Sequence, residues 1–139
     1  MATKEEISHF MAAAFPRSRF SIVDAGNRSA TVRRPVTPDD LRPGDTVSGP
    51  TMMALADTAL YVAIHATLGI TPQAVTSSLN INFLRRPSAG QALVARCKLL
   101  RVGRTLVVGE VTLFSEGSDD PVAHVVGTYA VAPARAAAD

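Results

Sequence analysis

The feature that most constrains this chain is a long apolar segment with a single charge near its centre. Residues 50–68 are almost wholly apolar or small, and Asp57 is the only residue with a formal charge between Thr46 and Leu84. Burying an unpaired carboxylate costs several kcal/mol or more. We therefore expect either a functional Asp57 or a structural one, which caps a turn or pairs with a distant arginine.

This segment predicts one long helix enclosed by the rest of the fold. Ser48 is a candidate N-cap, Pro50 suits the first helical turn, and Gly69 followed by Pro72 ends the helix. The segment has about the length that spans a bilayer, but Asp57 at its centre would cost at least ~2.5 kcal/mol there. A buried helix of a soluble protein fits better, because apolar side chains occupy every face.

The remaining segments predict a second helix and six strands. Helical spacing in EEISHFMAAAF predicts an N-terminal helix within residues 1–16, ended by Pro16. In the strand after the long helix, alternation places Thr76 and Leu79 on opposite faces. The strands are expected within residues 20–34 (a hairpin), 74–86, 91–102, 105–116 and 121–132, and an irregular loop within 37–45. An α+β fold with an antiparallel sheet wrapped around one apolar helix satisfies this order.

Composition narrows the class of protein. The 139 residues suit a single domain over 1–139, with 133–139 as a frayed tail, and a net charge of +2 gives no case for nucleic acid. Cys97 is the only cysteine, so there is no internal disulfide, and nothing near it indicates a metal site. The N-terminal sequence lacks the order of a signal peptide, so we expect a cytoplasmic protein that binds no membrane. Arginine outnumbers lysine, which suits phosphate binding or reflects a GC-rich genome.

Several short motifs, taken in order, resemble the hotdog-fold acyl-CoA thioesterases, and within them the PaaI-like branch named for phenylacetate degradation. The family's hallmark is a His-Gly-Gly turn entering the central helix, with an acidic residue eight positions after the first Gly. Gly49 and Asp57 match that pair, whereas Ser48 replaces the His, Pro50 the second Gly, and Arg42 a usual Asn or His. The resemblance covers about residues 20–132 and rests on VSGPTMMALADTA (47–59), on Leu79, Ile81, Phe83, Leu84, Arg85 and Pro87, and on Leu99, Arg101, Gly103, Arg104 and Leu106.

The resemblance implies hydrolysis of a CoA thioester at a site shared by two chains. Asp57 would be the general base, or less favourably the nucleophile, and the N–H of Gly49 on the partner chain would stabilise the oxyanion. Thr76 matches a hydroxyl that positions water in some members, and is otherwise an ordinary strand threonine. Ser48 either caps the helix or replaces the missing His. Pro50 has no N–H, so this turn offers one certain backbone donor.

The resemblance also implies partners and a pocket. Arg85, Arg86 and Arg104 would meet the phosphates of CoA, or are solvated surface charges. We expect no cofactor apart from the CoA of the substrate, self-association as a dimer or a dimer of dimers (a homotetramer), and a pocket walled partly by Met52, Met53 and Tyr61. A hotdog protein that binds an acyl-CoA or related ligand without turnover is the main alternative, and a purely structural assembly partner without a pocket is a third.

His65 has no predicted role in this chemistry. It lies eight residues from Asp57, about 12 Å along a helix, so the two side chains are too far apart to hydrogen-bond. A lone histidine in an apolar helix is more often a core residue. The Asp-x4-His spacing expected of hotdog hydratases is absent, which argues against a hydratase or dehydratase.

Overall fold

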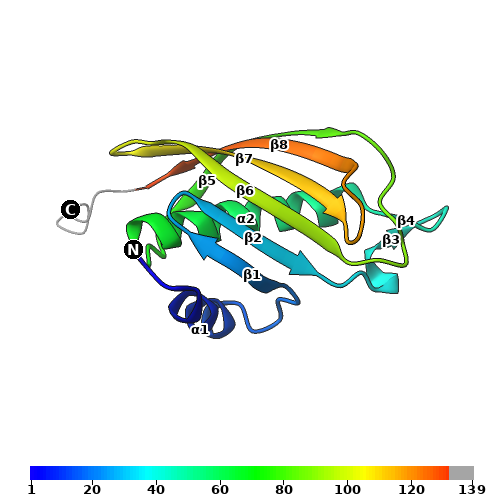
Figure 1. Cartoon of the computed structure of the whole chain (residues 1–139), viewed down its shortest axis with the longest axis horizontal. Coiled ribbons are helices and arrows are strands. Elements are labelled where there is room, and N and C mark those ends of the chain that lie inside the picture. Colours follow the sequence, from blue (N-terminus) through cyan, green and yellow to red (C-terminus); the bar gives the residue numbers. More distant parts are fainter. Residues whose placement is uncertain (132–139) are drawn as a thin grey trace.

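A six-stranded antiparallel sheet curves around one long helix in the computed structural model, which describes residues 1–131 (Figure 1). The strand order is β1-β2-β6-β7-β8-β5, and β3 and β4 form a separate two-stranded pair. The elements are α1 (Lys4–Ala14), β1 (Ser21–Gly26), β2 (Ser29–Arg34), the 3₁₀ helix η1 (Pro38–Asp40), β3 (Leu41–Arg42), β4 (Thr46–Val47), α2 (Gly49–Leu68), β5 (Val75–Phe83), β6 (Leu93–Val102), β7 (Leu106–Ser115) and β8 (Pro121–Ala130). The predicted architecture is confirmed, whereas the predicted tail at 133–139 lies outside the described residues.

Both predicted helices are present, and each begins at a side-chain cap. In α1, the Thr3 hydroxyl accepts a hydrogen bond from the N–H of Glu6 while the Glu6 carboxylate accepts one from the N–H of Thr3. In α2, the Ser48 hydroxyl accepts from the N–H of Thr51. The capping role of Ser48 is thereby confirmed. Gly69, at φ 94°, ends α2 in the left-handed region that glycine adopts without strain.

The loop at 37–45 is more regular than expected. Pro38 opens η1, where its fixed φ favours a helical turn. Gly44 and Asp45 then adopt positive φ and turn the chain back, so that β3 pairs with β4. The prediction of an irregular loop was wrong, because the turn-forming residues sit inside a short hairpin.

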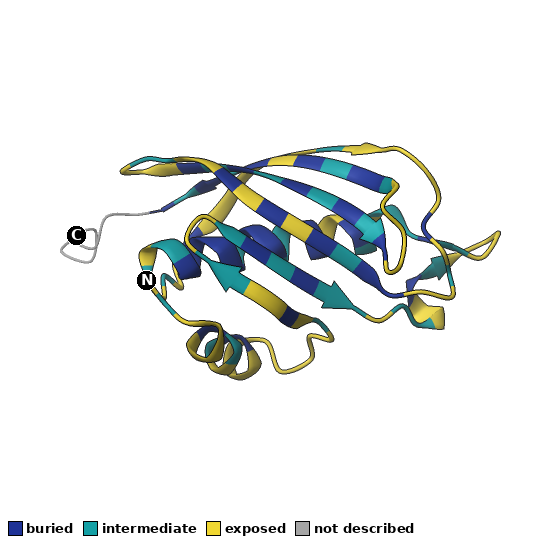
Figure 2. Cartoon of the chain, viewed as in Figure 1, coloured by how far each residue is buried: buried dark blue, intermediate teal, exposed yellow. Residues whose placement is uncertain are grey.

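Two glycines let α2 approach the sheet closely. Gly109 of β7 and Gly127 of β8 pair across the strands, and a Cβ on either would lie within 2.7 Å of the Leu60 side chain. Leu60 therefore packs into a depression in the sheet that only glycine leaves open. Around it, the buried residues of β6 alternate mostly with exposed ones, as Figure 2 shows, and those of β7 alternate with half-buried ones.

A β-bulge in β5 changes which way Thr76 faces. Thr76 pairs with Tyr129 of β8, but Ser78 pairs with the adjacent Thr128, so one extra residue is accommodated between them. Thr76 therefore lies on the same inward face as Leu79, which pairs with Gly127. The predicted opposite orientation was wrong, because a bulge shifts the alternation by one residue.

One side of α2 is not covered by the chain. Its length and composition would suffice to cross a membrane, but most of it is buried against the sheet as a core helix. The exception is a stripe at spacings of three and four residues that is exposed or half-exposed: Pro50, Met53, Ala54, Asp57, Thr58 and Tyr61. The prediction that the rest of the fold encloses this helix was therefore wrong for a single chain.

Candidate active site

Asp57 lines a cavity of about 340 Å³ between α1, α2 and the start of β5. It is half-buried rather than buried, and among the described residues it is the only acidic one in the cavity wall. Tyr61 of α2 lines this cavity as predicted, whereas Met52 and Met53 do not. Much of the apolar wall instead comes from the N-terminal region, through Met11, Phe15 and Phe20. We call this space the Asp57 cavity.

One oxygen of the Asp57 carboxylate is held by two hydroxyl groups. The Thr76 hydroxyl donates to Asp57 Oδ1 at 2.7 Å, and the Tyr129 hydroxyl donates to the same oxygen at 2.7 Å. Tyr129 also lies 3.1 Å from the backbone oxygen of Asp57. Within residues 1–131 the other oxygen, Oδ2, accepts no hydrogen bond. The arrangement fixes the carboxylate through one oxygen and leaves the other available for chemistry.

Tyr129 is a site residue that the sequence analysis missed. Its side chain is 3% exposed and lines the Asp57 cavity. Burial, together with the nearby Asp57 carboxylate, raises the pKa of Tyr129, so the hydroxyl stays protonated and can donate. The only sequence signal was its inward position in the last strand, which it shares with ordinary core residues.

Gly49 lines a different cavity, of about 540 Å³, at the N-terminus of α2. Arg42, Arg85 and Arg86 line the same cavity, together with Met52 and Phe83. A Cβ on Gly49 would lie 3.1 Å from the Phe83 ring, so glycine keeps this wall open. We call this space the Gly49 cavity. It combines a helix N-terminus with three arginines, and both features attract anions.

The N–H of Gly49 is free to bind a ligand. It belongs to the first turn of α2, whose N–H groups lack intrahelical acceptors, and no group within residues 1–131 accepts from it. Ser48 lies beside it with its hydroxyl engaged in capping, 2.8 Å from the Thr51 hydroxyl, and Pro50 supplies no donor. The turn therefore presents one free backbone donor.

Within one chain, Gly49 and Asp57 do not meet. Eight residues along a helix separate them by about 12 Å, and they line different cavities. The structure thus brings Thr76 to Asp57 and brings Arg85 and Arg86 to Gly49. Arg104 lies in the turn between β6 and β7 and lines neither cavity.

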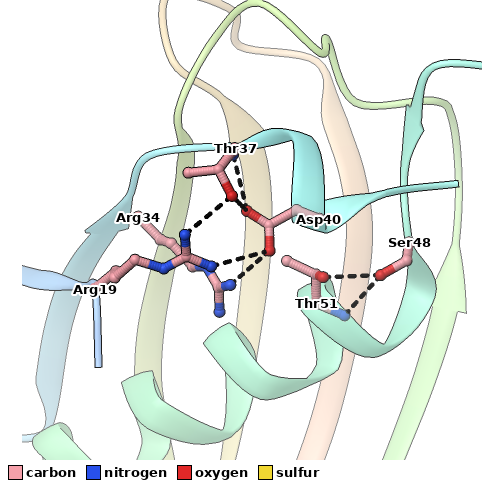
Figure 3. A network of polar contacts seen from close by, with 6 residues as sticks. All are labelled: Arg19, Arg34, Thr37, Asp40, Ser48 and Thr51. Atoms are coloured by element: carbon pink, nitrogen blue, oxygen red, sulfur yellow. Dashed lines mark hydrogen bonds and ion pairs between the residues drawn. The ribbon is translucent and has the colours of Figure 1, made fainter. Parts of the chain in front are cut away.

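A buried ion-pair network holds the loop that leads into α2 (Figure 3). Asp40 is 3% exposed, and its Oδ1 lies 2.6 Å from Arg34 Nη2 and 3.7 Å from Arg19 Nη2. Its Oδ2 accepts from the N–H of Thr37 at 2.9 Å. Burial acts to raise the pKa of Asp40, but the Thr37 hydrogen bonds and the two arginines outweigh it and lower the pKa. The backbone oxygen of Asp40 accepts from the N–H of Ser48 at 2.8 Å, so this network positions the turn that carries Gly49.

His65 is a core residue, as predicted. It is fully buried, and its Nδ1 accepts a hydrogen bond from the N–H of Thr71 at 2.9 Å. Its ring meets Phe10 and Tyr61 edge-on, at centroid distances of 5.3 and 4.2 Å. Burial lowers the pKa of His65, which keeps the ring neutral.

Comparison with known proteins decides the family. Residues 44–122 match the family model of the Thioesterase superfamily. The chain belongs to the thioesterase superfamily. A thioesterase candidate from Silicibacter sp. TM1040 is 41% identical over 94% of this chain and 92% of its own, with a TM-score of 0.87. A search against curated proteins gave no match.

Two other solved structures share the fold of this chain. A mutant of the phenylacetic acid degradation protein PaaI from Thermus thermophilus is 27% identical over 89% of this chain and 99% of its own, with a TM-score of 0.73. The Streptococcus mutans protein smu.793, solved bound to acetyl CoA, is 22% identical over 84% of this chain and 90% of its own, with a TM-score of 0.74. The resemblance to PaaI-like hotdog thioesterases, made from sequence motifs, is confirmed.

Proposed function

We propose that this thioesterase-superfamily protein is a cytoplasmic acyl-CoA thioesterase in which Asp57 is the general base. The observation that carries the proposal is the arrangement of the Asp57 carboxylate in an otherwise largely apolar cavity. Thr76 and Tyr129 hold its Oδ1, and no group within residues 1–131 donates to its Oδ2. A general base needs a fixed orientation and one free acceptor. Thr76 and Tyr129 supply the orientation, and the cavity has room for an acyl group.

The chemistry follows from these positions. Asp57 Oδ2 takes a proton from a water molecule, and the resulting hydroxide attacks the thioester carbonyl carbon. The N–H of Gly49 stabilises the oxygen that becomes negatively charged, a contribution typically equivalent to about 10²–10³ in rate. The C–S bond then breaks, the sulfur leaves as the CoA thiolate, and Asp57 retains the proton until it is released or transferred.

The separation of Gly49 and Asp57 requires a second chain. Among the described strands, β5 pairs only with β8, so its other edge is unpaired. This edge and the uncovered stripe of α2 form one continuous unpartnered side. β5 begins beside Asp57, through Thr76, and ends beside Gly49, through Phe83. Such an unpaired edge is a template for strand pairing.

A two-fold pairing of β5 with its own copy joins the two half-sites. An isologous antiparallel pairing about the strand's central residue, Leu79, sets Thr76 opposite Asn82 of the partner subunit. The Asp57 cavity of one chain then adjoins Gly49 of the partner subunit, with Arg85 and Arg86 of the partner subunit beside it. In this arrangement those arginines bind CoA phosphates, and Arg104, which lies elsewhere, is a candidate for a more distant phosphate. Two such dimers would assemble as a dimer of dimers.

Binding without turnover is the second candidate function. Pro50 leaves a single backbone donor at the turn, and Ser48 uses its hydroxyl for capping, so oxyanion stabilisation rests on the N–H of Gly49 alone. A protein with this geometry would hold an acyl-CoA between the same two cavities. The anchored Asp57 argues for catalysis instead, because its unbonded oxygen suits proton abstraction from water, whereas an acyl chain needs only apolar walls to bind.

Turnover of a CoA-thioester panel separates these functions. Short, medium, long-chain and aryl thioesters are assayed with the wild type, Asp57→Asn and a control, Asp119→Asn, which neutralises an exposed acid in the β7–β8 loop. Asn at 57 keeps an oxygen for Thr76 and Tyr129, so the fold should persist while turnover is abolished. Thioester binding without hydrolysis by the wild type, or full turnover by Asp57→Asn, would contradict catalysis by Asp57.

A further inference from the structure

A third cavity, rich in arginine, adjoins the Asp57 cavity. It measures about 530 Å³ and is lined by Phe15, Pro16, Arg17, Ser18, Arg19 and Arg34. Phe15 and Ser18 also line the Asp57 cavity, so the segment after α1 forms a wall common to both spaces. We call this third space the arginine pocket.

The arginine pocket carries more positive than negative charge. The acid that pairs with its arginines is Asp40, which contacts Arg34 and Arg19 (Figure 3). One buried carboxylate thus balances three guanidinium groups, and Thr37 already occupies its second oxygen. The charge balance leaves a surplus of two positive charges in the pocket.

Most donors of these arginines are unused. A guanidinium has five N–H groups in a fixed fork, yet within the described residues Arg34 donates one hydrogen bond, to Asp40, and Arg19 one, to Thr37. Within residues 1–131 Arg17 has no ion pair, and the buried Nε of Arg34 has no acceptor. Arg17 and Arg19 are exposed, so their unused donors can reach an incoming anion. A carboxylate matches the fork best, since it can accept two parallel hydrogen bonds.

We propose that the arginine pocket binds a carboxylate at the far end of the acyl chain, and that the substrates are ω-carboxyacyl-CoA thioesters. This inference rests on the proposed function. The thioester lies at Asp57, the methylene chain lies against the apolar walls formed by Met11, Phe15 and Phe20, and the terminal carboxylate passes Ser18 to reach Arg17 and Arg19. The phosphates of CoA lie at the opposite end, in the Gly49 cavity of the partner subunit.

Matched substrate pairs test the inference. We compare kcat/KM for ω-carboxyacyl-CoA and unsubstituted acyl-CoA of equal chain length, such as adipoyl-CoA and hexanoyl-CoA, across a series of lengths. The variant is Arg17→Gln, with Lys98→Gln as the control because Lys98 is exposed on a strand remote from the pocket lining. Arg19 and Arg34 are left intact because both contact buried Asp40, whose network positions the turn that carries Gly49.

The expected result is a preference of the wild type for the ω-carboxylate of roughly tenfold or more at one chain length, since hydrogen bonds to charged groups contribute about 1.5–3 kcal/mol. Arg17→Gln reduces this preference while hydrolysis of the unsubstituted thioester stays within about twofold of wild type. Added salt also reduces the preference, and Lys98→Gln retains it. Equal kcat/KM for both members of every pair would overturn the inference and leave the proposed function standing.

Two further arms separate the remaining outcomes. If the wild type hydrolyses neither substrate, the proposed function fails. Calorimetric binding of the same thioester pairs to Asp57→Asn then still tests the role of the arginine pocket. Tighter binding of the ω-carboxyacyl-CoA supports the inference, and equal binding of the two thioesters overturns it. Free adipate added with hexanoyl-CoA should inhibit weakly and competitively. Activation by free adipate would instead identify a separate effector site for carboxylates and overturn the assignment to the substrate.

Discussion

Replacing Tyr129 with phenylalanine removes one of the two hydroxyls that hold Asp57 and leaves the aromatic ring in place. The lost hydrogen bond, at 2.7 Å to Asp57 Oδ1, is made to a carboxylate from a side chain that is 3% exposed. Hydrogen bonds to charged groups contribute about 1.5–3 kcal/mol. If that energy serves to orient Asp57 Oδ2 in the transition state, kcat should fall by about 10-fold to 100-fold.

The assay compares kcat and KM for the best thioester of the panel, together with thermal unfolding. We expect KM to change little, because Tyr129 acts on Asp57 rather than on the acyl group, and the melting temperature to fall by several degrees. The matched control is Tyr61→Phe, which removes a hydroxyl from the same cavity. The Tyr61 hydroxyl donates to the backbone oxygen of Pro72 at 3.1 Å and does not contact Asp57.

The reasoning is refuted if Tyr129→Phe keeps the wild-type kcat, or if Tyr61→Phe loses as much kcat. The first result would show that Thr76 alone orients the carboxylate. The second would show that any loss of a polar group from the cavity has the same effect.

Three other residues give testable consequences. Gly49→Ala should keep the melting temperature within a few degrees but lower kcat/KM roughly tenfold, because the new methyl group displaces the Phe83 ring across the Gly49 cavity. Asp40→Asn should destabilise the fold by about 3 kcal/mol in urea unfolding, since it leaves Arg34 without its ion partner. Because the pKa of Asp40 is lowered in the folded protein, its contribution to the free energy of unfolding is fully present above pH 3.8 and is lost as pH falls toward the folded pKa. If the free energy of unfolding of Asp40→Asn had the same pH dependence as that of the wild type in this range, the ion pair would be contradicted. Because burial lowers the pKa of His65 below 6.5, stability should fall as pH drops from 6.5 toward the folded pKa, and His65→Asn should flatten that slope in unfolding measured between about pH 5 and 8.

Local signals in the sequence predicted most of the fold. Ser48 and Gly69 bound the long helix because capping depends on the residue at the cap itself. The strands followed from their alternation and from the turns between them. The pairing of Gly49 with Asp57 came from a resemblance, and their separation within one chain explains why the proposed site needs a second chain.

The parts that could not be predicted depend on tertiary contacts. The bulge after Thr76 leaves no mark in the alternation, yet it reverses the face on which Thr76 lies. From the sequence, Tyr129 is indistinguishable from a core residue, because its hydrogen bond to Asp57 of α2 joins residues far apart in the chain. Asp57 was expected to be buried from its apolar neighbours in the sequence, but its side of α2 is the one that this chain leaves open.

The most direct test of the central claim is activity of a mixed dimer with one Asp57→Asn chain and one Gly49→Leu chain, isolated by two different affinity tags. If Asp57 works with Gly49 of the partner subunit, each homodimer is inactive, whereas the mixed dimer carries one doubly altered site and one intact site. The account predicts about half of the wild-type turnover per dimer, as expected for one of two symmetric sites. A folded mixed dimer as inactive as the two homodimers would contradict a site shared between chains.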